Sequence, residues 1–375
     1  MPHITSVRTT LSQFVMPRPW VPEAPWLHLV RVDVIDDEGA AGAGFTWTPT
    51  IGAHAVQALL DHDITEAALG RTTDAEALWP QLWAQLHEAG GGGITTIALA
   101  GLDTALWDLR GRRAGLGLAD LIGRRRSSVR AYGSGVNLHL SADELAAQVG
   151  RWIAAGFDAV KVKVGKPDIA EDVDRVTMVR ELLGPDRRLM IDANQRWDLM
   201  RAVPALERLS VVAPAWIEEL LRSDDTAGYE RLRQHTSVPI AMGENVHTVH
   251  RFRDLIDRGV ADVLQPNVVR VGGITPFLAI AELVESAGLT LAPHLLPDLS
   301  GQLALALPQT TEIEDVEDAD FVSIGAIDAP GPVTIYNAEL TVEERPGLGF
   351  VIRDEATAAR TPADGVTEPT LTTAR

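Results

Sequence analysis

Three acidic residues are evenly spaced in the middle of the chain, and each closes a short apolar run typical of a strand. Asp192, Glu218 and Glu244 follow one another at intervals of 26 residues. One strand, one helix and two loops use about that length, because a whole βαβ unit needs roughly 30 residues or more. In a parallel barrel the C-terminal ends of the strands meet on one face, so the three carboxylates would converge. Converging oxygen ligands suit a hard divalent cation such as Mg²⁺.

Two lysines lie on an earlier predicted strand, residues 160–164. Lys161 and Lys163 are two positions apart, so their side chains point to the same face. On an isolated strand they would be two solvated lysines. In a parallel sheet both faces are covered, and an adjacent pair of cations then needs a chemical reason. One such reason is catalysis, because the charge of Lys161 would depress the pKa of Lys163 and make it a usable base.

Polar side chains also follow other predicted strands. His294 alone would be a core or loop histidine, but opposite the lysine pair across a metal it is a candidate acid or base. Asn267 ends the preceding strand, where it could hydrogen-bond His294, and Asn194 could orient a ligand. The Asp192 region alone could equally be a helix N-cap. The three acids together predict a metal more firmly, since without a cation they would repel one another.

The elements that must position these residues alternate along the chain. Helical patterns separate the strand-like runs, at about 142–155, 168–183, 198–209, 225–235, 248–258 and 275–287. Strands alternating with helices indicate a parallel sheet, and so many units in series predict an α/β fold of the TIM (β/α) barrel type. We expect this barrel domain to occupy residues 131–330.

The first 130 residues have a different pattern. Strand-like segments at 3–12, 27–36 and 41–47 are followed by helical patterns at 53–60, 74–88 and 94–110, which predicts a separate α+β domain. Strand-like residues at 333–352, around the turn Arg345-Pro-Gly347, would return to it, so that about 331–355 complete this domain. The tail at 356–375 is rich in Ala, Thr and Pro and is expected to fray.

The segment 16–26 contains four prolines and two tryptophans. It is either a stiff surface loop packed by its own side chains or a lid over an active site. If it is a lid, Trp20 faces the substrate, and Trp47 on the third predicted strand is a second candidate. These apolar side chains leave the polarity of the substrate open.

Composition narrows the classes of function. The chain has 375 residues, 46% of them hydrophobic, which is enough for a sizeable core. A net charge of −19 argues against nucleic acid or an anionic membrane as a partner. The absence of cysteine excludes disulfides and thiol catalysis and fits a reducing cytoplasm. No apolar run is long enough to span a membrane, and the N-terminus lacks the features of a signal peptide. We therefore predict a cytoplasmic enzyme.

Taken together, these residues resemble the enolase superfamily and, within it, the mandelate racemase subgroup. The likeness covers nearly the whole chain and rests on the motifs Lys161-Val-Lys163, Asp192-Ala-Asn194, Trp216-Ile-Glu-Glu219, Met242-Gly-Glu-Asn245, Val271-Gly-Gly273 and the His294 loop. The resemblance implies a modified (β/α)7β barrel with an N-terminal α+β capping domain. It also implies a small-molecule carboxylate substrate and a symmetric homo-oligomer.

The resemblance also assigns roles. Asp192, Glu218 and Glu244 would bind Mg²⁺, Lys163 would be one acid/base catalyst tuned by Lys161, and His294 would act from the other face. Glu314 matches a glutamate that hydrogen-bonds the substrate carboxylate. The implied reaction is abstraction of the proton α to a carboxylate, made feasible by a metal that stabilises the resulting enediolate.

Two positions depart from the subgroup. Asn267 stands where an aspartate usually pairs with the histidine, and Leu220 stands where a proline usually follows the two acids. An asparagine can orient an imidazole but cannot stabilise its charged form, so His294 would be a weaker base. That weakens racemisation by two bases, but it affects dehydration less, because His294 then needs only to donate a proton. Leu220 concerns the following loop rather than the metal ligand.

Three functional hypotheses follow. The preferred one is a Mg²⁺-dependent lyase that dehydrates a hydroxylated carboxylate such as a sugar acid. The nearest rival is a racemase or epimerase of an α-substituted carboxylic acid, which would use Lys163 and His294 from opposite faces. The third is a catalytically silent barrel that binds a metal or a sugar acid.

Overall fold

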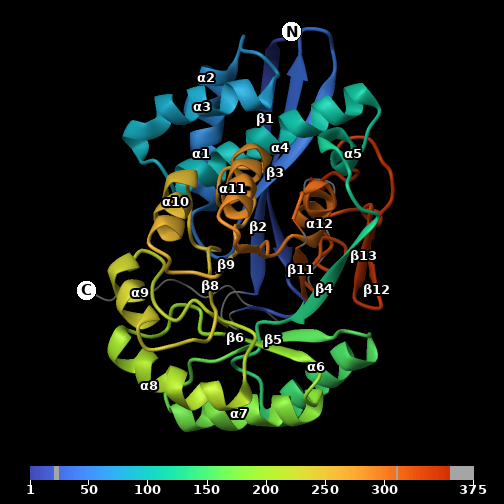
Figure 1. Cartoon of the computed structure of the whole chain (residues 1–375). Helices are drawn as coiled ribbons and strands as arrows, with labels where there is room; N and C mark the ends of the chain where they lie inside the picture. The colour runs from blue at the N-terminus through green and yellow to red at the C-terminus, as the bar shows by residue number, and fades with distance from the viewer. Residues whose placement is uncertain (21–24, 310, 355–375) are drawn as a thin grey trace, which may run out of the picture.

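A computed structural model describes residues 1–20, 25–309 and 311–354, and it contains an N-terminal α+β layer beside a barrel (Figure 1). Within the described residues, the N-terminal sheet is antiparallel in the order β1-β2-β3. Its strands are β1 (Ile4–Val15), β2 (Trp26–Asp36) and β3 (Ala41–Thr48). The helical segments that follow are α1 (Ala53–Leu59), a π-helical turn (Leu60–Ile64), α2 (Thr65–Ala68), α3 (Ala75–Leu86), a 3₁₀ turn (His87–Ala89), α4 (Ile94–Ala114) and α5 (Leu118–Ile122).

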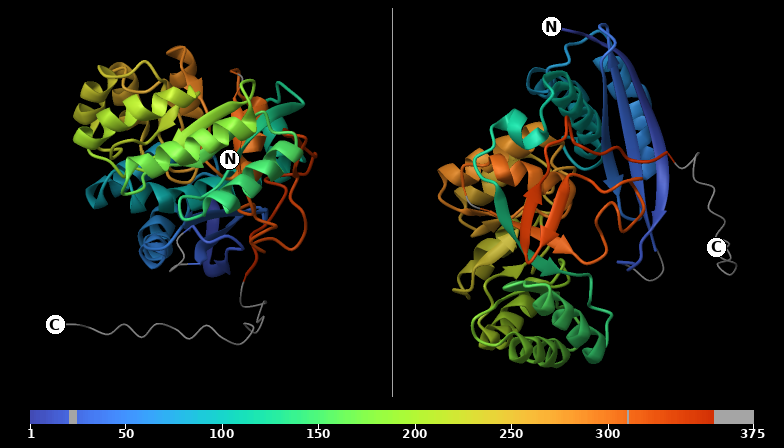
Figure 2. Two further views of the ribbon diagram at one scale, coloured as in Figure 1. Left: turned by 90° about the horizontal axis from the view of Figure 1, so that it is seen from below. Right: turned by 90° about the vertical axis from the view of Figure 1, so that its right-hand side faces the viewer.

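Helix α4 joins the two parts of the molecule. It packs against β2 and β3 on one side and against barrel helix α11 (Ile274–Ser286) on the other, as the right-hand view of Figure 2 shows. The approach to the sheet is close, because a Cβ added at Gly44 would lie 2.2 Å from the Ala105 backbone nitrogen. Trp107 on α4 donates to the Thr275 hydroxyl of α11 (3.0 Å). The capping sheet is therefore fixed to the barrel through one long buried helix.

In the described part of the chain the barrel has eight parallel strands, and the predicted (β/α)7β fold is confirmed. The strands are β4 (Ser128–Ser134), β5 (Ala159–Lys163), β6 (Arg188–Asp192), β7 (Ile217–Glu218), β8 (Ile240–Met242), β9 (Val263–Leu264), β10 (Thr290–Leu291) and β11 (Glu312–Val316). Strands β4 to β10 pair in chain order, and β11 returns to pair with β4.

Helices alternate with these strands. They are α6 (Ala142–Ala154), α7 (Ile169–Leu183), α8 (Leu199–Leu209) with a 3₁₀ turn (Ser210–Val212), α9 (Thr226–Arg233), α10 (Val249–Asp257), α11 and α12 (Pro297–Ala306). The predicted helices at 142–155 to 275–287 are all present within a few residues. Helix α12 and strand β11 were not expected. No helix in the described ranges is long and apolar enough to cross a membrane.

Strand register sets the positions of the polar residues. Lys163 pairs with Asp192 across β5 and β6, and Asp192 pairs with Glu218 across β6 and β7. Side chains two residues earlier on the strands face the same way, because the side-chain period of a strand is two. Met190 and Trp216, two residues before Asp192 and Glu218, belong to one buried apolar cluster. The corresponding residue before Lys163 is Lys161. The barrel interior is thus filled beneath the polar residues, which stand at its C-terminal mouth.

The C-terminal hairpin differs from the prediction. Strands β12 (Val333–Tyr336) and β13 (Glu339–Val342) turn at Asn337 and Ala338, which have positive φ values of 51° and 56°, and not at Arg345-Pro-Gly347. The hairpin joins the barrel sheet, because β13 pairs antiparallel with the start of β4, before β5 joins that strand at Gly133. It therefore covers backbone of β4 that would otherwise be an open edge.

The residues after the hairpin contact the capping domain. Leu348 donates its backbone N–H to Asp108 on α4 (2.8 Å), and Arg31 on β2 donates to the Ile352 carbonyl (3.3 Å). The domain limits themselves, 1–130 with about 331–355 and 131–330, remain predictions. The expected frayed tail at 356–375 lies outside the described residues.

The close contact between β3 and α4 makes a testable prediction. Gly44→Ala should lower the free energy of unfolding by about 1–3 kcal/mol, because the new methyl group overpacks against the α4 backbone. Gly150→Ala is the matched control, since a Cβ at that exposed position of α6 meets no atom within 4 Å. It should stabilise the protein by up to about 1 kcal/mol. Urea unfolding measures both, and equal effects would contradict the described packing.

Candidate active site

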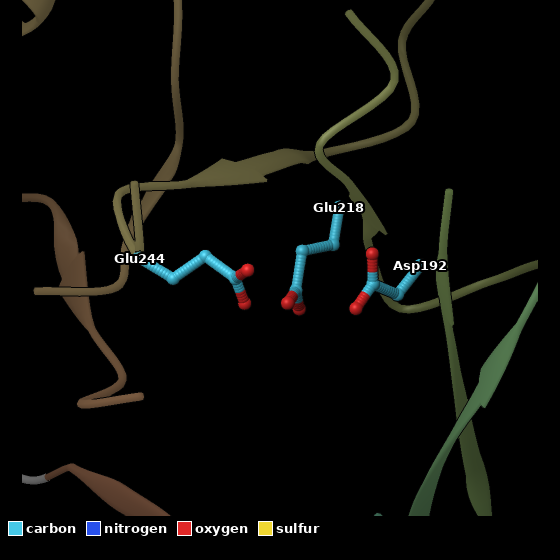
Figure 3. A group of neighbouring side chains, drawn as sticks. All are labelled: Asp192, Glu218 and Glu244. Atoms are coloured by element: carbon cyan, nitrogen blue, oxygen red, sulfur yellow. The ribbon is translucent and has the colours of Figure 1, made fainter. Parts of the chain in front are cut away.

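Three carboxylates meet at the C-terminal mouth of the barrel. Asp192 ends β6, Glu218 ends β7 and Glu244 follows β8, and all three are buried. One oxygen from each lies within 4.8 Å of the others, and Figure 3 shows the carboxylates pointing toward a common space. The structure thus brings together the three residues that the sequence spacing selected. This arrangement of hard oxygen donors is suited to Mg²⁺.

The electrostatics of this triad also fit a cation. Burial and the neighbouring Asp192 charge raise the pKa of Glu218 to about 8, so the triad resists full ionisation on its own. Glu244 Oε2 is buried and, among the described residues, has no hydrogen-bond partner. Its nearest charged neighbour is His294 Nε2 at 2.9 Å, which forms an ion pair with it only when the imidazole is protonated. A bound divalent cation would provide this oxygen with a partner and would favour the ionised form of Glu218.

The two lysines contact the triad from one side. Lys161 is completely buried, and its Nζ donates to Glu218 Oε1 (2.8 Å) and lies 2.7 Å from Glu314 Oε1. Lys163 Nζ donates to Asp192 Oδ2. Both lysines therefore have acid partners, and Lys163 also lines the cavity above the triad.

The predicted depression of the Lys163 pKa is not what the structure shows. Burial lowers the pKa of Lys163, but the Asp192 charge raises it, and the net direction is upward. Lys161 acts in the predicted direction and lowers the Lys163 pKa, but the carboxylates outweigh it. Lys163 becomes a usable base only where the charge of Asp192 is neutralised, and the metal that Asp192 is placed to bind supplies that condition.

His294 and Asn267 form a defined pair. Asn267 Oδ1 accepts hydrogen bonds from the backbone N–H groups of Val269 and Arg270 (both 3.1 Å), which fixes the orientation of the amide. Asn267 Nδ2 must then face His294 Nδ1, at 3.0 Å. Because an amide NH₂ group can only donate, Nδ1 is the acceptor and the proton of the neutral imidazole is on Nε2. The imidazole therefore presents an N–H group on its other side.

Glu314 on β11 lies in the cavity wall. It accepts a hydrogen bond from the Ser134 hydroxyl (2.7 Å) and another from the Leu295 backbone N–H (3.1 Å). Burial alone would raise the pKa of Glu314. The positive charges nearby, Lys161 first among them, act in the opposite direction and together outweigh burial, so the pKa falls to about 2. Glu314 is thus the ionised counter-charge of Lys161. Its predicted hydrogen bond to a substrate carboxylate stays a prediction.

A cavity of about 250 Å³ connects these groups. Its wall includes the predicted residues Trp20, Trp47, Lys163, Asn194, Glu244, His294 and Glu314. The rings of Trp20 and Trp47 meet edge to face, with their centroids 5.7 Å apart. Residues 21–24 of the predicted lid lie outside the described residues. The cavity volume lies just below the usual range for ligand sites, about 300–1,000 Å³, which suits a small acid.

Sequence reasoning missed several polar residues around this cavity. Gln265 donates to Glu218 Oε2 (2.6 Å), and Asn137 Oδ1 accepts from the Lys163 backbone N–H (2.9 Å). Arg196 and Arg270 line the cavity. Gln265 could have been found, because it lies two residues before Asn267. The arginines lie in loops after β6 and β9. Active sites of such barrels are built from these loops, but no regular spacing in the sequence points to a particular residue within them.

Fold and site define a metal-dependent (β/α)7β barrel enzyme with a lysine pair on one side and a histidine on the other. Residues 4–123 match the mandelate racemase/muconate lactonizing enzyme N-terminal domain, and residues 144–356 match the enolase C-terminal domain-like family. The chain belongs to the mandelate racemase/muconate lactonizing enzyme family of the enolase superfamily.

Curated relatives span most of the chain. It is similar to the 3,6-anhydro-alpha-L-galactonate cycloisomerase of Streptomyces coelicolor, with 36% identity over 87% of this chain and 89% of the relative. It is also similar to the L-talarate/galactarate dehydratase of Salmonella typhimurium, with 33% identity over 88% of this chain and 81% of that enzyme.

Solved structures agree with this assignment. A racemase from Streptomyces coelicolor with bound magnesium has a TM-score of 0.87 and 34% identity, covering 93% of this chain and 97% of its own. L-talarate dehydratase from a Polaromonas species, complexed with Mg and L-glucarate, has a TM-score of 0.83 and 35% identity, covering 96% and 97%. With the carboxylate triad of this chain, these structures confirm the prediction of Mg²⁺ as cofactor.

The triad predicts a stability response to the metal. Mg²⁺ at 100 times its dissociation constant should stabilise the native protein by about 2.7 kcal/mol, because the folded state alone holds the three ligands together. Thermal unfolding with Mg²⁺ and with a chelator measures the effect. Glu218→Gln should abolish most of it. Glu312→Gln, which removes the same charge at the start of β11, should leave it intact. A full Mg²⁺ response in Glu218→Gln would exclude this site.

Proposed function

We propose that the chain catalyses Mg²⁺-dependent β-elimination from a small hydroxylated carboxylate, and that its reaction is the dehydration of a sugar acid. Lys163 removes the α-proton, and His294 gives a proton to the departing β-oxygen. The metal held by Asp192, Glu218 and Glu244 supplies a Lewis acid for the substrate carboxylate. The proposal rests above all on the orientation of the His294 imidazole.

That orientation distinguishes an acid from a base. Because Asn267 donates to Nδ1, His294 carries its proton on Nε2, and Nε2 has no lone pair with which to accept a proton. An aspartate at position 267 would instead accept from an Nδ1–H group and leave Nε2 free as a base. His294 is therefore suited to protonating a leaving group rather than to taking a second α-proton, as racemisation by two bases requires.

Residues of this chain accept and donate the protons of the elimination. The α-proton moves to Lys163 Nζ, and its bonding pair becomes negative charge on the carboxylate. Lys161 is buried beside the triad, and its positive charge lies close to where this negative charge develops. The pair then forms the Cα–Cβ double bond as the Cβ–O bond breaks. The oxygen takes the Nε2 proton of the neutral His294 imidazole and leaves as water. The Lys163 ammonium then returns a proton to His294 through solvent, which restores both groups.

A ring-opening reaction is a second candidate, and the 36% identity to a cycloisomerase is the observation that favours it. If the β-oxygen belongs to a ring of the substrate, the same proton transfers break the ring and release no water. The site geometry supports both outcomes, since Lys163 and His294 act in the same way. A relative named an epimerase is 25% identical, and the orientation of His294 does not favour that reaction.

The proposal also covers the cellular compartment and the oligomeric state. We place the enzyme in the cytoplasm, supported by the absence of cysteine, and we propose that it works as a symmetric homo-oligomer, as its family resemblance implies. Light scattering of the purified protein tests the oligomeric state. A monomer at all concentrations would contradict that part of the proposal.

Turnover in D₂O tests the proposed reaction. With Mg²⁺ and a panel of sugar acids, the enzyme should release water and form a dehydrated product, and Lys163→Ala should lower kcat by at least about 100-fold, because the α-proton loses its acceptor. Mass spectrometry and NMR follow both products. Deuterium at the α-carbon without loss of water would favour the racemase reading. Turnover that Lys163→Ala leaves unchanged would contradict the proposal.

The Asn267 amide makes a separate prediction. At a pH where the imidazole is neutral, Asn267→Asp should reverse it so that Nε2 is unprotonated, and dehydration should then fall by about 100-fold because the leaving oxygen loses its acid. The variant should gain α-deuterium exchange in D₂O, since His294 can then act as a base. Asn267→Ala is the control, which should lose dehydration without gaining exchange. Asn267→Asp with unchanged dehydration would show that the amide does not set the role of His294.

A further inference from the structure

Among the described residues, two arginines at the cavity have no carboxylate partner. Arg196 lies in the loop after β6, and Arg270 lies in the loop after β9. We propose that Arg196, assisted by Arg270, binds a second carboxylate of the substrate, so that the enzyme acts on dicarboxylic sugar acids. This inference rests on the proposed elimination at the same site and names the substrate class that the site selects.

Arg196 is an exposed residue that lines the cavity. The sequence has 52 acidic and 33 basic residues, so acid partners are abundant. Within residues 1–20, 25–309 and 311–354, the Arg196 guanidinium makes no hydrogen bond or ion pair. Many other arginines in these ranges, such as Arg208 and Arg253, also lack an acid partner, but apart from Arg270 none of them lines this cavity. An unmatched guanidinium beside a ligand cavity suggests that the ligand supplies its partner.

The position of Arg196 is also built into the fold. A Cβ added at Gly165 would lie 2.5 Å from Arg196 Cδ, so the arginine stem lies directly over this glycine. Gly165 has a φ of 114°, and its N–H donates to Asp172 Oδ2 (2.9 Å), which fixes the loop just after Lys163. A side chain at position 165 would displace Arg196. The arginine is thus held beside the strand that carries the proposed base.

Arg270 is placed by a different set of contacts. Its Nη1 donates to Asn245 Oδ1, and Asn245 Nδ2 donates to both carboxylate oxygens of Glu219 (2.9 Å each). Asn245 therefore stands between the arginine and the nearest acid of this network. The Arg270 backbone N–H holds Asn267 Oδ1, so the arginine keeps a fixed relation to His294.

The cavity has positive charge that its own acidic residues do not neutralise. Glu244 is a metal ligand in the proposed site, and Glu314 is paired with Lys161. A metal held by the triad would take the α-carboxylate of the substrate, and the two arginines would then still lack an anionic partner. A guanidinium binds a carboxylate through two parallel hydrogen bonds, so a terminal carboxylate satisfies Arg196 better than a terminal hydroxyl does.

Matched substrates test this inference. Galactarate and galactonate share one configuration and differ only in a terminal carboxylate or hydroxymethyl group, and glucarate and gluconate form a second such pair. With Mg²⁺, kcat/KM should be at least about 10-fold higher for the dicarboxylate of whichever pair is accepted. Arg196→Gln should lower kcat/KM for that dicarboxylate by about 10- to 100-fold, the range for a hydrogen-bonded charge. For the monocarboxylate it should change by less than about threefold.

Two further variants complete the design. Arg196→Lys keeps the charge without the forked donors and should give an intermediate loss. Arg208→Gln removes the same charge from an exposed position on α8 and should leave both substrates unaffected. Equal kcat/KM values within a pair, or an Arg196→Gln loss shared equally by both acids, would overturn the proposed second-carboxylate site.

Binding to Mg²⁺-loaded Lys163→Ala, measured by calorimetry, separates this inference from the proposed reaction. The dicarboxylate should bind at least about 10-fold more tightly than its monocarboxylate partner, and adding Arg196→Gln should remove the difference. Selective binding without turnover by the unmodified enzyme would support the inference and contradict the elimination. If monocarboxylates and dicarboxylates are turned over equally well, and turnover depends on Mg²⁺ and Lys163, the elimination is supported and the inference is contradicted. Equal binding, or none, overturns the inference.

Discussion

The repulsion among three buried carboxylates is the constraint on which the rest of the site depends. Asp192, Glu218 and Glu244 lie within 4.8 Å of one another in a water-poor environment, where like charges interact strongly. Burial and Asp192 already raise the pKa of Glu218 to about 8. The surrounding structure supplies positive charge to offset this repulsion, from Lys161 and Lys163 on β5 and from the metal. The same positive charges matter for the chemistry, because the lysines and the metal also stabilise negative charge that develops on a substrate.

The barrel makes this concentration of charge possible. Each acid comes from a different strand or strand end, so no short stretch of chain has to hold two of the ligands. The apolar layer that includes Met190 and Trp216 lies beneath them and keeps water away from that side. The capping domain closes the other side with Trp20 and Trp47, and α4 connects it to α11. The N-terminal sheet thus contributes a wall of the cavity, while the proposed proton-transfer groups all come from the barrel.

Sequence reasoning succeeded where the signal was periodic. The 26-residue interval and the pairing of Lys161 with Lys163 follow from the regular β/α repeat, and the structure brings those side chains together. Strand β11 was missed because Glu312-Ile-Glu-Asp315 is too acidic to resemble a buried strand. The hairpin turn was misplaced because Pro346 and Gly347 are stronger local turn signals than Asn337-Ala338. The direction of the Lys163 pKa was also wrong, because it depends on an ion pair with Asp192, 29 positions away in sequence.

Asn267 illustrates how a substitution of similar shape can change chemistry without changing the fold. Its Oδ1 caps two backbone N–H groups, and an aspartate could accept the same two hydrogen bonds. The difference lies in the second polar atom, which donates in asparagine and accepts in aspartate. That single change decides which imidazole nitrogen of His294 carries the proton. The metal centre and the lysines are unaffected, because they lie on other strands. In this barrel the reaction type and the substrate class can therefore vary separately, the first through the partner of His294 and the second through loop residues such as Arg196.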